Sequence, residues 1–304
     1  MHQALFVLID IGGTAIKHGI ATSDGQLLER HEIPTEAHLS GGLGIVSKVE
    51  HICKEAQTRF GAQVTGVAIS TAGMVDPDTH TIIYALPDAI PDYTGVDYAK
   101  VVTQGFGLPC EVENDVNCAA LGEMWQGAGK GCRSVFCMTI GTSIGGAMIV
   151  DGKLVSGASH SAGEIAYMRV PGGMLHELAS TTFLVKKYCE LQHLTGDAAA
   201  AVNGKVIFDA AEANEPNATE AIAQLVEHLS DGITNVVAAQ NPEAVILGGG
   251  IMARSDYLRP RLEAALKGKL RDIVFAATRI EFAQLQNDAG MLGALYHFKQ
   301  RSLL

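Results

Sequence analysis

Charged side chains are scarce in this sequence, and basic ones are the scarcer kind. Asp, Glu, Lys and Arg make up 18% of the 304 residues, and 33 acidic residues outnumber 22 basic ones. A nucleic-acid surface needs clustered Lys and Arg to displace counterions from phosphates, so we expect no nucleic-acid partner. Apolar residues reach 47%, which argues against disorder and predicts a large core in two domains.

Long apolar runs and closely paired cysteines are missing too. The sequence contains no stretch of 18 or more apolar residues, which is the length that could span a membrane. The N-terminus lacks the features of a secretory signal. We therefore expect a cytoplasmic protein with no membrane partner. The six cysteines form no CxxC pair, which predicts reduced thiols in the core. His160 and His176 have no third and fourth ligand at a usable spacing, so no zinc is expected.

The stretch from Cys110 to Gly146 places polar side chains and glycines at the ends of two predicted strands. An apolar run ends in Glu113-Asn114-Asp115, and open α/β sheets place their ligands at such strand ends. A helical spacing of apolar residues follows. A second strand, 135–140, then runs into a loop, Gly141–Gly146, whose bare backbone and hydroxyls suit phosphate oxygens. We expect a catalytic base and a phosphate loop to lie close together.

The order of elements around this glycine loop occurs twice in the chain. Near the start, a strand leads into Asp10–Thr14, a second strand follows, and an Asp-Gly turn precedes a third. The segment 138–155 repeats this order, with Thr139-Ile140-Gly141 in place of Asp10-Ile11-Gly12. This repetition predicts an α/β fold of two similar lobes, each bringing a glycine hairpin to a shared cleft; two unrelated hairpins are the alternative.

Two further segments are candidate ligand contacts. The strand that ends in Ser70–Gly73 has small residues that allow a ligand close to the backbone, although a plain turn would look the same. The irregular segment 152–180 carries Glu164 and Glu177. Carboxylates on such a segment suit a polyhydroxylated substrate because their oxygens accept from neighbouring hydroxyls, whereas solvated surface charge is the alternative.

Six motifs together resemble those of the ROK sugar kinases, in order and over nearly the whole chain. The resemblance implies an actin-like ATPase (ribonuclease H-like) fold with two lobes around an ATP and sugar cleft. It places one lobe at residues 1–115, with the helix 290–304 packing back on it, and the other at 116–289. The motifs are DIGGT at 10–14, END-x-N at 113–117, TIGTSIGG at 139–146, SAGEIAYM at 161–168, ILGGG at 246–250 and NDAGMLGA at 287–294.

The resemblance also implies roles for individual residues. Asp115 would be the catalytic base, with MgATP as the phosphoryl donor and Asp10 and Asp115 placing the magnesium ion. A homodimer is suggested as well. The implied substrate residues are Gly73, Asn114, Glu164, Tyr167 and Glu177, and the implied ATP-binding residues are Asp10, Gly12, Gly13, Thr14, Lys17, Gly141, Thr142, Gly145, Gly248, Gly249 and Gly250.

The sequence departs from the family pattern around the sugar. Tyr167 replaces a histidine, and 170–176 lacks the cysteines of the family's structural zinc box, so zinc is not implied. Ala72 and Ala85 replace the family's usual proline and asparagine. The zinc-free pattern with tyrosine resembles the β-glucoside kinases, which phosphorylate the 6-hydroxyl of cellobiose-type sugars. Glucokinase, N-acetylmannosamine kinase and fructokinase activities stay open.

Three unrelated classes of function are supported less well. A non-catalytic sugar-binding regulator would not need the intact Asp115 and both glycine loops, and the family's repressors carry a preceding DNA-binding domain that we do not expect here. A chaperone or filament protein would not need Glu164 and Glu177. Gly248–Ala253 formally matches the dinucleotide motif GxGxxA, but no βαβ unit with its acidic residue is evident, which argues against NAD.

Overall fold

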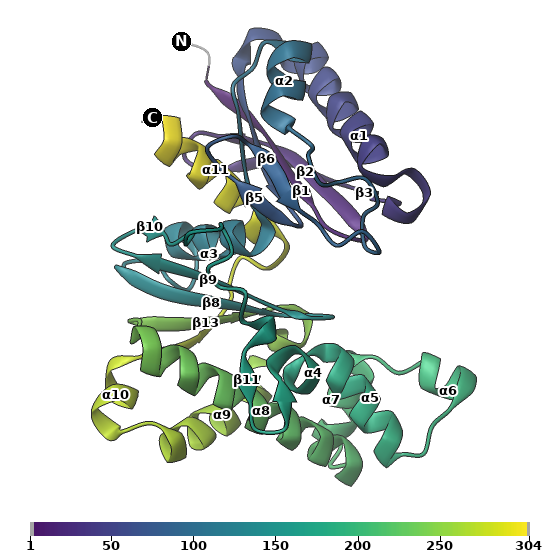
Figure 1. Ribbon diagram of the computed structural model, residues 1–304, viewed down its shortest axis with the longest axis vertical. Helices are drawn as coiled ribbons and strands as arrows, with labels where there is room; N and C mark the ends of the chain where they lie inside the picture. The colour runs from purple at the N-terminus through teal and green to yellow at the C-terminus, as the bar shows by residue number, and fades with distance from the viewer. Residues whose placement is uncertain (1–2, 303–304) are drawn as a thin grey trace. The chain divides into compact units, whose positions relative to one another are not determined.

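A computed structural model describes residues 3–302, which fold into two compact units (Figure 1). The first unit contains 3–126, 156–161 and 287–302, and the second contains 127–155 and 162–286. Each unit has its own five-stranded sheet and its own hydrophobic core. Within residues 3–302, no helix is both long and apolar enough to cross a bilayer.

The five-stranded sheet of the first unit is antiparallel on one side of its central strand, β1, and parallel on the other side. β1 pairs with β2 and β2 with β3 in antiparallel fashion, whereas β1, β4 and β7 run parallel. β1 has the sequence LFVLIDI and is buried along almost its whole length, as a central strand should be. In spatial order the strands are β3 (Leu27–Pro34), β2 (Ala15–Thr22), β1 (Leu5–Ile11), β4 (Val64–Thr71) and β7 (Cys110–Asn114).

Alternate residues of β1 face two different helical layers, because side chains along a strand point to opposite faces of the sheet. Val7 and Ile9 pack with residues of α1 (Ala37–Phe60) and α2 (Tyr98–Phe106). Phe6 and Leu8 pack with residues of α3 (Asp115–Gln126) and α11 (Ala289–Ser302) on the other face. Figure 1 shows α1 and α2 on one side of β1 and β2, and α11 on the other. The short elements are η1 (Gly61–Gln63), β5 (Met74–Asp76), β6 (Thr81–Tyr84) and η4 (Gln286–Asp288).

Helices α3 and α11 approach each other closely enough to require glycine. A Cβ atom at Gly122 would lie 2.5 Å from the carbonyl oxygen of Ala289, and one at Gly293 would clash with the carbonyl oxygen of Cys118. α3 and α11 belong to the same unit, whose first segment ends at Gln126, the last residue of α3. α11 belongs to the same unit, although it is the last helix of the chain.

The sheet of the second unit repeats the strand order of the first. Two antiparallel pairings are followed by two parallel ones, as in the first sheet, so the predicted duplication is confirmed. The carboxyl ends of β8 and β13 therefore correspond to those of β1 and β4. In spatial order the strands are β10 (Lys153–Leu154), β9 (Ile144–Val150), β8 (Ser134–Ile140), β13 (Ala244–Gly248) and β14 (Arg279–Phe282).

Helix α8 (Pro216–Gln240) forms the centre of the helical layer in the second unit. Its buried residues include Leu225 and Leu229, which share a core with Val245 and Leu247 of β13. Pro216 is tolerated in the first turn of α8, because a backbone N–H at that position would have no partner within the helix. The other elements of this unit are η2 (Ile165–Tyr167), β11 (Arg169–Val170), β12 (Gly173–Met174), α4 (Leu175–Ala179), α5 (Thr181–Leu191), α6 (Gly196–Ala200), α7 (Gly204–Glu212), η3 (Gly250–Ala253), α9 (Ser255–Lys269) and α10 (Asp272–Ala277).

We expect the helix crossing to be intolerant of a single methyl group. Gly293→Ala should lower the Tm by about 5–10 °C, because overpacking a close contact costs about 3 kcal/mol. Gly105→Ala in α2 is the matched control, since a Cβ there meets nothing within 4 Å. It should keep or slightly raise the Tm, because alanine favours helix. Thermal melts followed by circular dichroism compare the Tm values of the two variants. Equal Tm values would contradict the close contact between α3 and α11.

Candidate active site

The carboxyl ends of the parallel strands in the first unit gather the acidic candidates. Asp10 of β1 lies opposite Ser70 of β4, and the hydroxyl of Ser70 donates to Oδ1 of Asp10 at 2.6 Å. The next strand, β7, ends at Asn114, and Asp115 begins α3 directly after it. Burial raises the pKa of Asp10, although the Ser70 hydroxyl and the charge of Lys17 oppose that shift.

Asp115 is partly buried, and the surrounding protein desolvates its carboxyl group, which also lies close to a like charge. Burial raises its pKa to about 7, and the negative charge of Asp10 acts in the same direction. The backbone N–H of Val116 and the side-chain amide of Asn114 both donate to Oδ1 of Asp115 at 2.9 Å, which fixes its orientation. A carboxylate with a pKa near neutrality is suited to accept a proton and to give it up again.

The side chain of Asn114, at the end of β7, forms hydrogen bonds with the start of α3 and with the turn at Gly73. Its carbonyl oxygen accepts from the backbone N–H groups of Val116 and Asn117, which caps the start of α3. Its amide nitrogen donates to Asp115 and to the carbonyl oxygen of Gly73 at 2.9 Å. Gly73 has φ +100°, which favours glycine, and a Cβ there would lie 2.9 Å from the carbonyl oxygen of Tyr84. These bonds position Asp115 and the Gly73 turn together.

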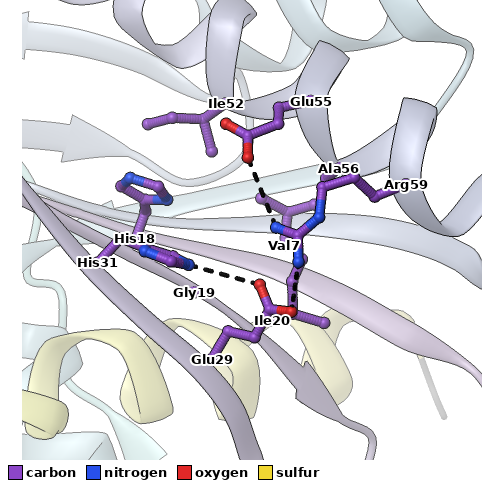
Figure 2. Close-up of a pocket in the computed structure, with 10 residues that line it drawn as sticks. All are labelled: Val7, His18, Gly19, Ile20, Glu29, His31, Ile52, Glu55, Ala56 and Arg59. Atoms are coloured by element: carbon purple, nitrogen blue, oxygen red, sulfur yellow. Dashed lines mark hydrogen bonds and ion pairs between the residues drawn. The ribbon is translucent and has the colours of Figure 1, made fainter.

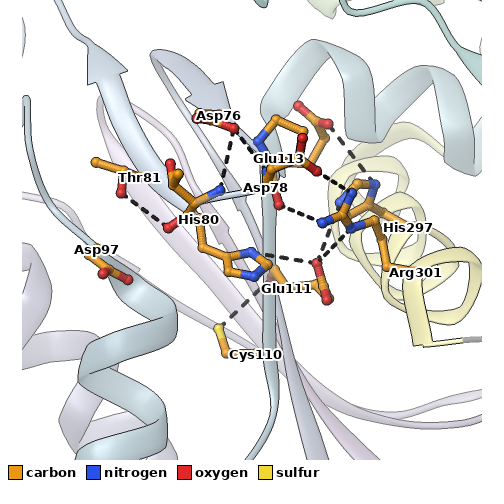
Figure 3. Close-up of polar contacts among 12 residues, drawn as sticks. Asp76, Asp78, His80, Thr81, Asp97, Cys110, Glu111, Glu113, His297 and Arg301 are labelled. Atoms are coloured by element: carbon orange, nitrogen blue, oxygen red, sulfur yellow. Dashed lines mark hydrogen bonds and ion pairs between the residues drawn. The ribbon is translucent and has the colours of Figure 1, made fainter.

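A buried polar cluster lies behind these residues and was missed by the sequence interpretation. Oε1 of Glu113 accepts from the backbone N–H of Asn114 and from the side chain of Asn117. Figure 3 shows His80, Glu111, His297 and Arg301 gathered around the same strand. Nδ1 of His80 lies 3.6 Å from Glu111, and Nε of Arg301 lies 3.4 Å from it.

Burial controls the ionisation of this cluster. It raises the pKa of Glu111 and of Glu113, and it lowers the pKa of His297 to about 4. Nδ1 of His297 lies 4.0 Å from Glu113, so α11 contributes a side chain directly behind the strand that ends at Asn114. The alternation of Glu111 and Glu113 with apolar residues in β7 was the available signal for this cluster.

The hairpin between β1 and β2 carries the first group of predicted ATP-binding residues. Gly12 donates its N–H to the carbonyl oxygen of Ala15 and closes the turn, while Gly13 and Thr14 are exposed. The hydroxyl of Thr35 donates to the carbonyl oxygen of Gly12 at 2.6 Å and supports the loop from behind. Lys17 lies opposite Asp10 in the strand pairing and donates to Asn287 at 3.0 Å.

The second unit brings its own predicted ATP-binding residues together at one sheet edge. Gly141 follows β8 and Gly248 ends β13, and Gly248 pairs with Thr139. Gly249 has φ +105°, and a Cβ there would clash with the carbonyl oxygen of Ile140. The sequence predicted a helix from Thr181, which is α5, but not its contact with the glycine loop. The N–H of Thr181 donates to the carbonyl oxygen of Gly141, and the hydroxyl of Thr182 donates to the carbonyl oxygen of Thr142, both at 2.8 Å. Gly145 lies in β9, and Gly250 begins η3.

The three remaining sugar candidates occupy one short segment of the second unit. Glu164 precedes η2 and is exposed, yet nearby protein desolvates its carboxyl group and raises its pKa. No residue within 3–302 forms a hydrogen bond or ion pair with that carboxylate. Tyr167 ends η2 and packs edge-on against His176. Glu177 instead accepts from the backbone N–H of Met174 at 3.0 Å and caps α4.

The acidic candidates fit the ligand preferences of magnesium. Mg²⁺ prefers oxygen ligands, keeps several waters, and is commonly bound by one or two carboxylates together with substrate phosphates. Asp10 and Asp115 are two carboxylates close enough for their charges to interact. Among residues 3–302, there is no group of three or more His, Cys, Asp or Glu side chains that could hold a metal ion.

A separate small pocket lies between strands β2 and β3 and helix α1 (Figure 2). The stacked rings of His18 and His31 form one side of it, and Arg59 forms ion pairs with Glu29 and Glu55 on another. Burial lowers the pKa of His18. None of the residues predicted from the sequence to bind ATP or sugar lines this pocket.

The family model of the ROK family matches residues 6–301 of the chain. The chain belongs to the ROK family. Its sheets, glycine hairpins and acidic strand ends are thus those of a ROK protein, and the resemblance drawn from the six motifs is confirmed.

Three similar proteins place this ROK protein among sugar-binding relatives. A beta-glucoside kinase of Listeria monocytogenes is 33% identical, and the alignment covers 96% of each chain. The structure of a ROK family glucokinase from Streptomyces griseus in complex with glucose and AMPPNP is 30% identical, with a TM-score of 0.79 over 96% of this chain and 98% of that one. A ROK family protein from Streptococcus pneumoniae in complex with sucrose is 28% identical, with a TM-score of 0.83 over 98% and 99%.

The fold of this ROK protein is the actin-like ATPase fold. The two α/β units and the similarity to ROK sugar kinase structures confirm the fold class predicted from the motifs.

The pKa of Asp115 leads to a pH-dependent effect on stability. A carboxyl group with a folded-state pKa of about 7 and an unfolded pKa near 3.8 favours folding at low pH, and this contribution is lost as the pH rises through 7. Asp115→Asn removes the buried charge. It should therefore increase the free energy of unfolding at pH 8 by on the order of 2 kcal/mol more than at pH 5.

Thermal melts at pH 5 and pH 8 check this difference through the change in Tm. Asp88→Asn is the matched control because Asp88 is exposed, and its Tm change should be the same at both pH values. An equal Tm change for Asp115→Asn at the two pH values would show that its carboxyl group is not desolvated in the folded protein.

Proposed function

We propose that this ROK protein is an ATP-dependent sugar kinase that phosphorylates the 6-hydroxyl of a sugar, with a β-glucoside such as cellobiose as the preferred substrate. The observation that carries the proposal is the placement of Asp115. It stands at the carboxyl end of parallel strands, its pKa is about 7, and Asn114 and Val116 fix its orientation.

Asp115 acts as the general base in this proposal. Its ionised carboxylate accepts the proton of the 6-hydroxyl as the sugar oxygen forms a bond to the γ-phosphorus, and the bond from that phosphorus to the β-phosphate oxygen of ATP breaks. Little covalent chemistry falls to the protein, so positioning and charge stabilisation carry most of the catalysis. Asp10 and Asp115 would hold Mg²⁺, which when bound neutralises charge on the phosphates.

The glycine hairpins hold the nucleotide in this proposal. The N–H groups of Gly12 and Gly141 close the two turns, which leaves Gly13 and Thr14 exposed in the first unit and Thr142 and Ser143 exposed in the second. Backbone and hydroxyl groups at such exposed turns suit phosphate oxygens. Gly248 to Gly250 lie at the same sheet edge as Gly141 and would contact the adenosine. The Streptomyces griseus relative was solved with AMPPNP, which supports ATP as the donor.

Glu164 is the principal sugar ligand in this proposal, and Gly73, Asn114, Tyr167 and Glu177 are the accompanying ones. A carboxylate with no protein partner can accept from two neighbouring hydroxyls of a sugar ring. The named β-glucoside kinase and the relative that binds sucrose support a disaccharide-sized substrate, whereas the glucose complex keeps glucokinase as the first alternative. N-acetylmannosamine kinase and fructokinase are the remaining candidates within the family.

Sugar-dependent ADP release with MgATP tests the proposed function. We expect turnover with cellobiose or gentiobiose that exceeds turnover with glucose, N-acetylmannosamine and fructose. Asp115→Asn should lower kcat by about a thousandfold, because a positioned base contributes factors of this order. If no sugar gave turnover, the proposed kinase activity would be wrong and a sugar-binding regulator would be favoured. If Asp115→Asn kept a near-normal kcat, the proposed role of Asp115 as general base would be wrong.

The two glutamates of the sugar segment should differ in their effects. Glu164→Gln should raise the KM for the sugar by at least about tenfold, because it removes a charged acceptor of sugar hydroxyls. Glu177→Gln should have a smaller effect, because the carboxylate of Glu177 already accepts from the N–H of Met174. Steady-state kinetics at saturating ATP measure both. A larger change in the sugar KM for Glu177→Gln than for Glu164→Gln would contradict the assignment of Glu164 as the principal sugar ligand.

A further inference from the structure

The hairpin of β11 and β12 brings two aromatic side chains into direct opposition. Arg169 pairs with Met174 and Val170 with Gly173. The same register continues outward, since the N–H of Leu175 donates to the carbonyl oxygen of Met168 at 2.9 Å. One step further, it places Tyr167 opposite His176. Their ring centroids lie 5.8 Å apart at an interplanar angle of 63°, which is an edge-to-face contact.

The aromatic pair is fixed on its inner side and open on its outer side. Val170 and Leu175, next to the pair in the hairpin, are buried in the core of the second unit. Tyr167 has 61% of its surface exposed. The contact with His176 thus restrains the ring, while more than half of the surface of Tyr167 stays exposed. An aromatic side chain has few rotatable bonds, so it can bind a ligand at a low cost in conformational entropy.

Glu164 directly precedes the short helix η2, and Tyr167 ends it, so the two residues are three positions apart in the chain. Both side chains are exposed, whereas Ile165 and Ala166 between them are buried. A carboxylate that holds the hydroxyls of one ring would therefore lie in the same short segment as an aromatic side chain that can contact the next ring.

We propose that Tyr167 and His176 form a binding platform for the second ring of a β-linked disaccharide, and this inference rests on the proposed function. The axial C–H groups of a β-glucosyl ring form an apolar face that packs against the negative face of an aromatic ring. The platform recognises that face, and Glu164 recognises hydroxyls of the phosphorylated ring. Disaccharide preference is thus a property of the hairpin and not of the acidic strand ends.

The ratio of kcat/KM for cellobiose to kcat/KM for glucose tests the platform. Tyr167→Ala and His176→Ala should each lower this ratio, Tyr167→Ala by about tenfold, since an aromatic contact of this kind contributes about that factor. Tyr167→Phe keeps the aromatic face and should keep the ratio. Ile273→Ala is the matched control, because Ile273 is 80% exposed on α10 of the same unit and should leave both sugars unaffected. An unchanged ratio in Tyr167→Ala would overturn the platform.

Calorimetric titration with cellobiose and with glucose, without nucleotide, separates this inference from the kinase proposal. If the wild-type protein releases no ADP with any sugar, the kinase proposal fails, and the titrations still decide the platform. Tyr167→Ala should weaken cellobiose binding more than glucose binding. Equal weakening, or no cellobiose binding by the wild-type protein, would overturn the inference. A change of sedimentation coefficient in Tyr167→Ala with an unchanged sugar ratio would show instead that the pair contacts a second copy of the chain.

Discussion

The repulsion between two carboxylates, Asp10 and Asp115, is the constraint on which the first unit depends. Both groups stand at strand ends where the chain desolvates them, and each is balanced by specific donors: Ser70 for Asp10, and Asn114 and Val116 for Asp115. α11 leaves room for this arrangement only because residue 290 is glycine, since a Cβ there would lie 2.6 Å from the carboxyl carbon of Asp10. The fold thus holds two acidic groups close together, and burial together with their mutual repulsion raises the pKa of Asp115 to about 7.

Much of the fold could be predicted from local patterns. The apolar strands with glycine turns predicted the duplication, and the END motif predicted the acidic strand end, because both depend on residues adjacent in the sequence. The place of α3 could not be predicted in this way. It depends on contacts of Gly122 with α11, which lies far along the chain, and a local pattern of apolar residues cannot predict such a contact.

The polar cluster behind Asn114 was missed for a similar reason. The sequence groups Glu113 with Asn114 and Asp115 at a strand end, and only the folded chain places His297 beside it. Segment 152–180 was interpreted as irregular, and it contains η2, the β11–β12 hairpin and α4. Its elements are two to five residues long, too short for a periodic signal. The roles of Glu164, Tyr167 and Glu177 stay predictions, and only their local geometry is known.

The matching strand orders of the two sheets have an evolutionary consequence. In one copy of the repeated sheet, acidic residues lie at the ends of β1 and β7, whereas in the other copy glycines follow β8 and end β13, so the same strand order carries different residue types. The hairpin of β11 and β12 lies outside both sheets. Substitutions in this hairpin therefore need not disturb the strand register of either copy. The hairpin can diverge between related proteins while both five-stranded sheets keep their strand order.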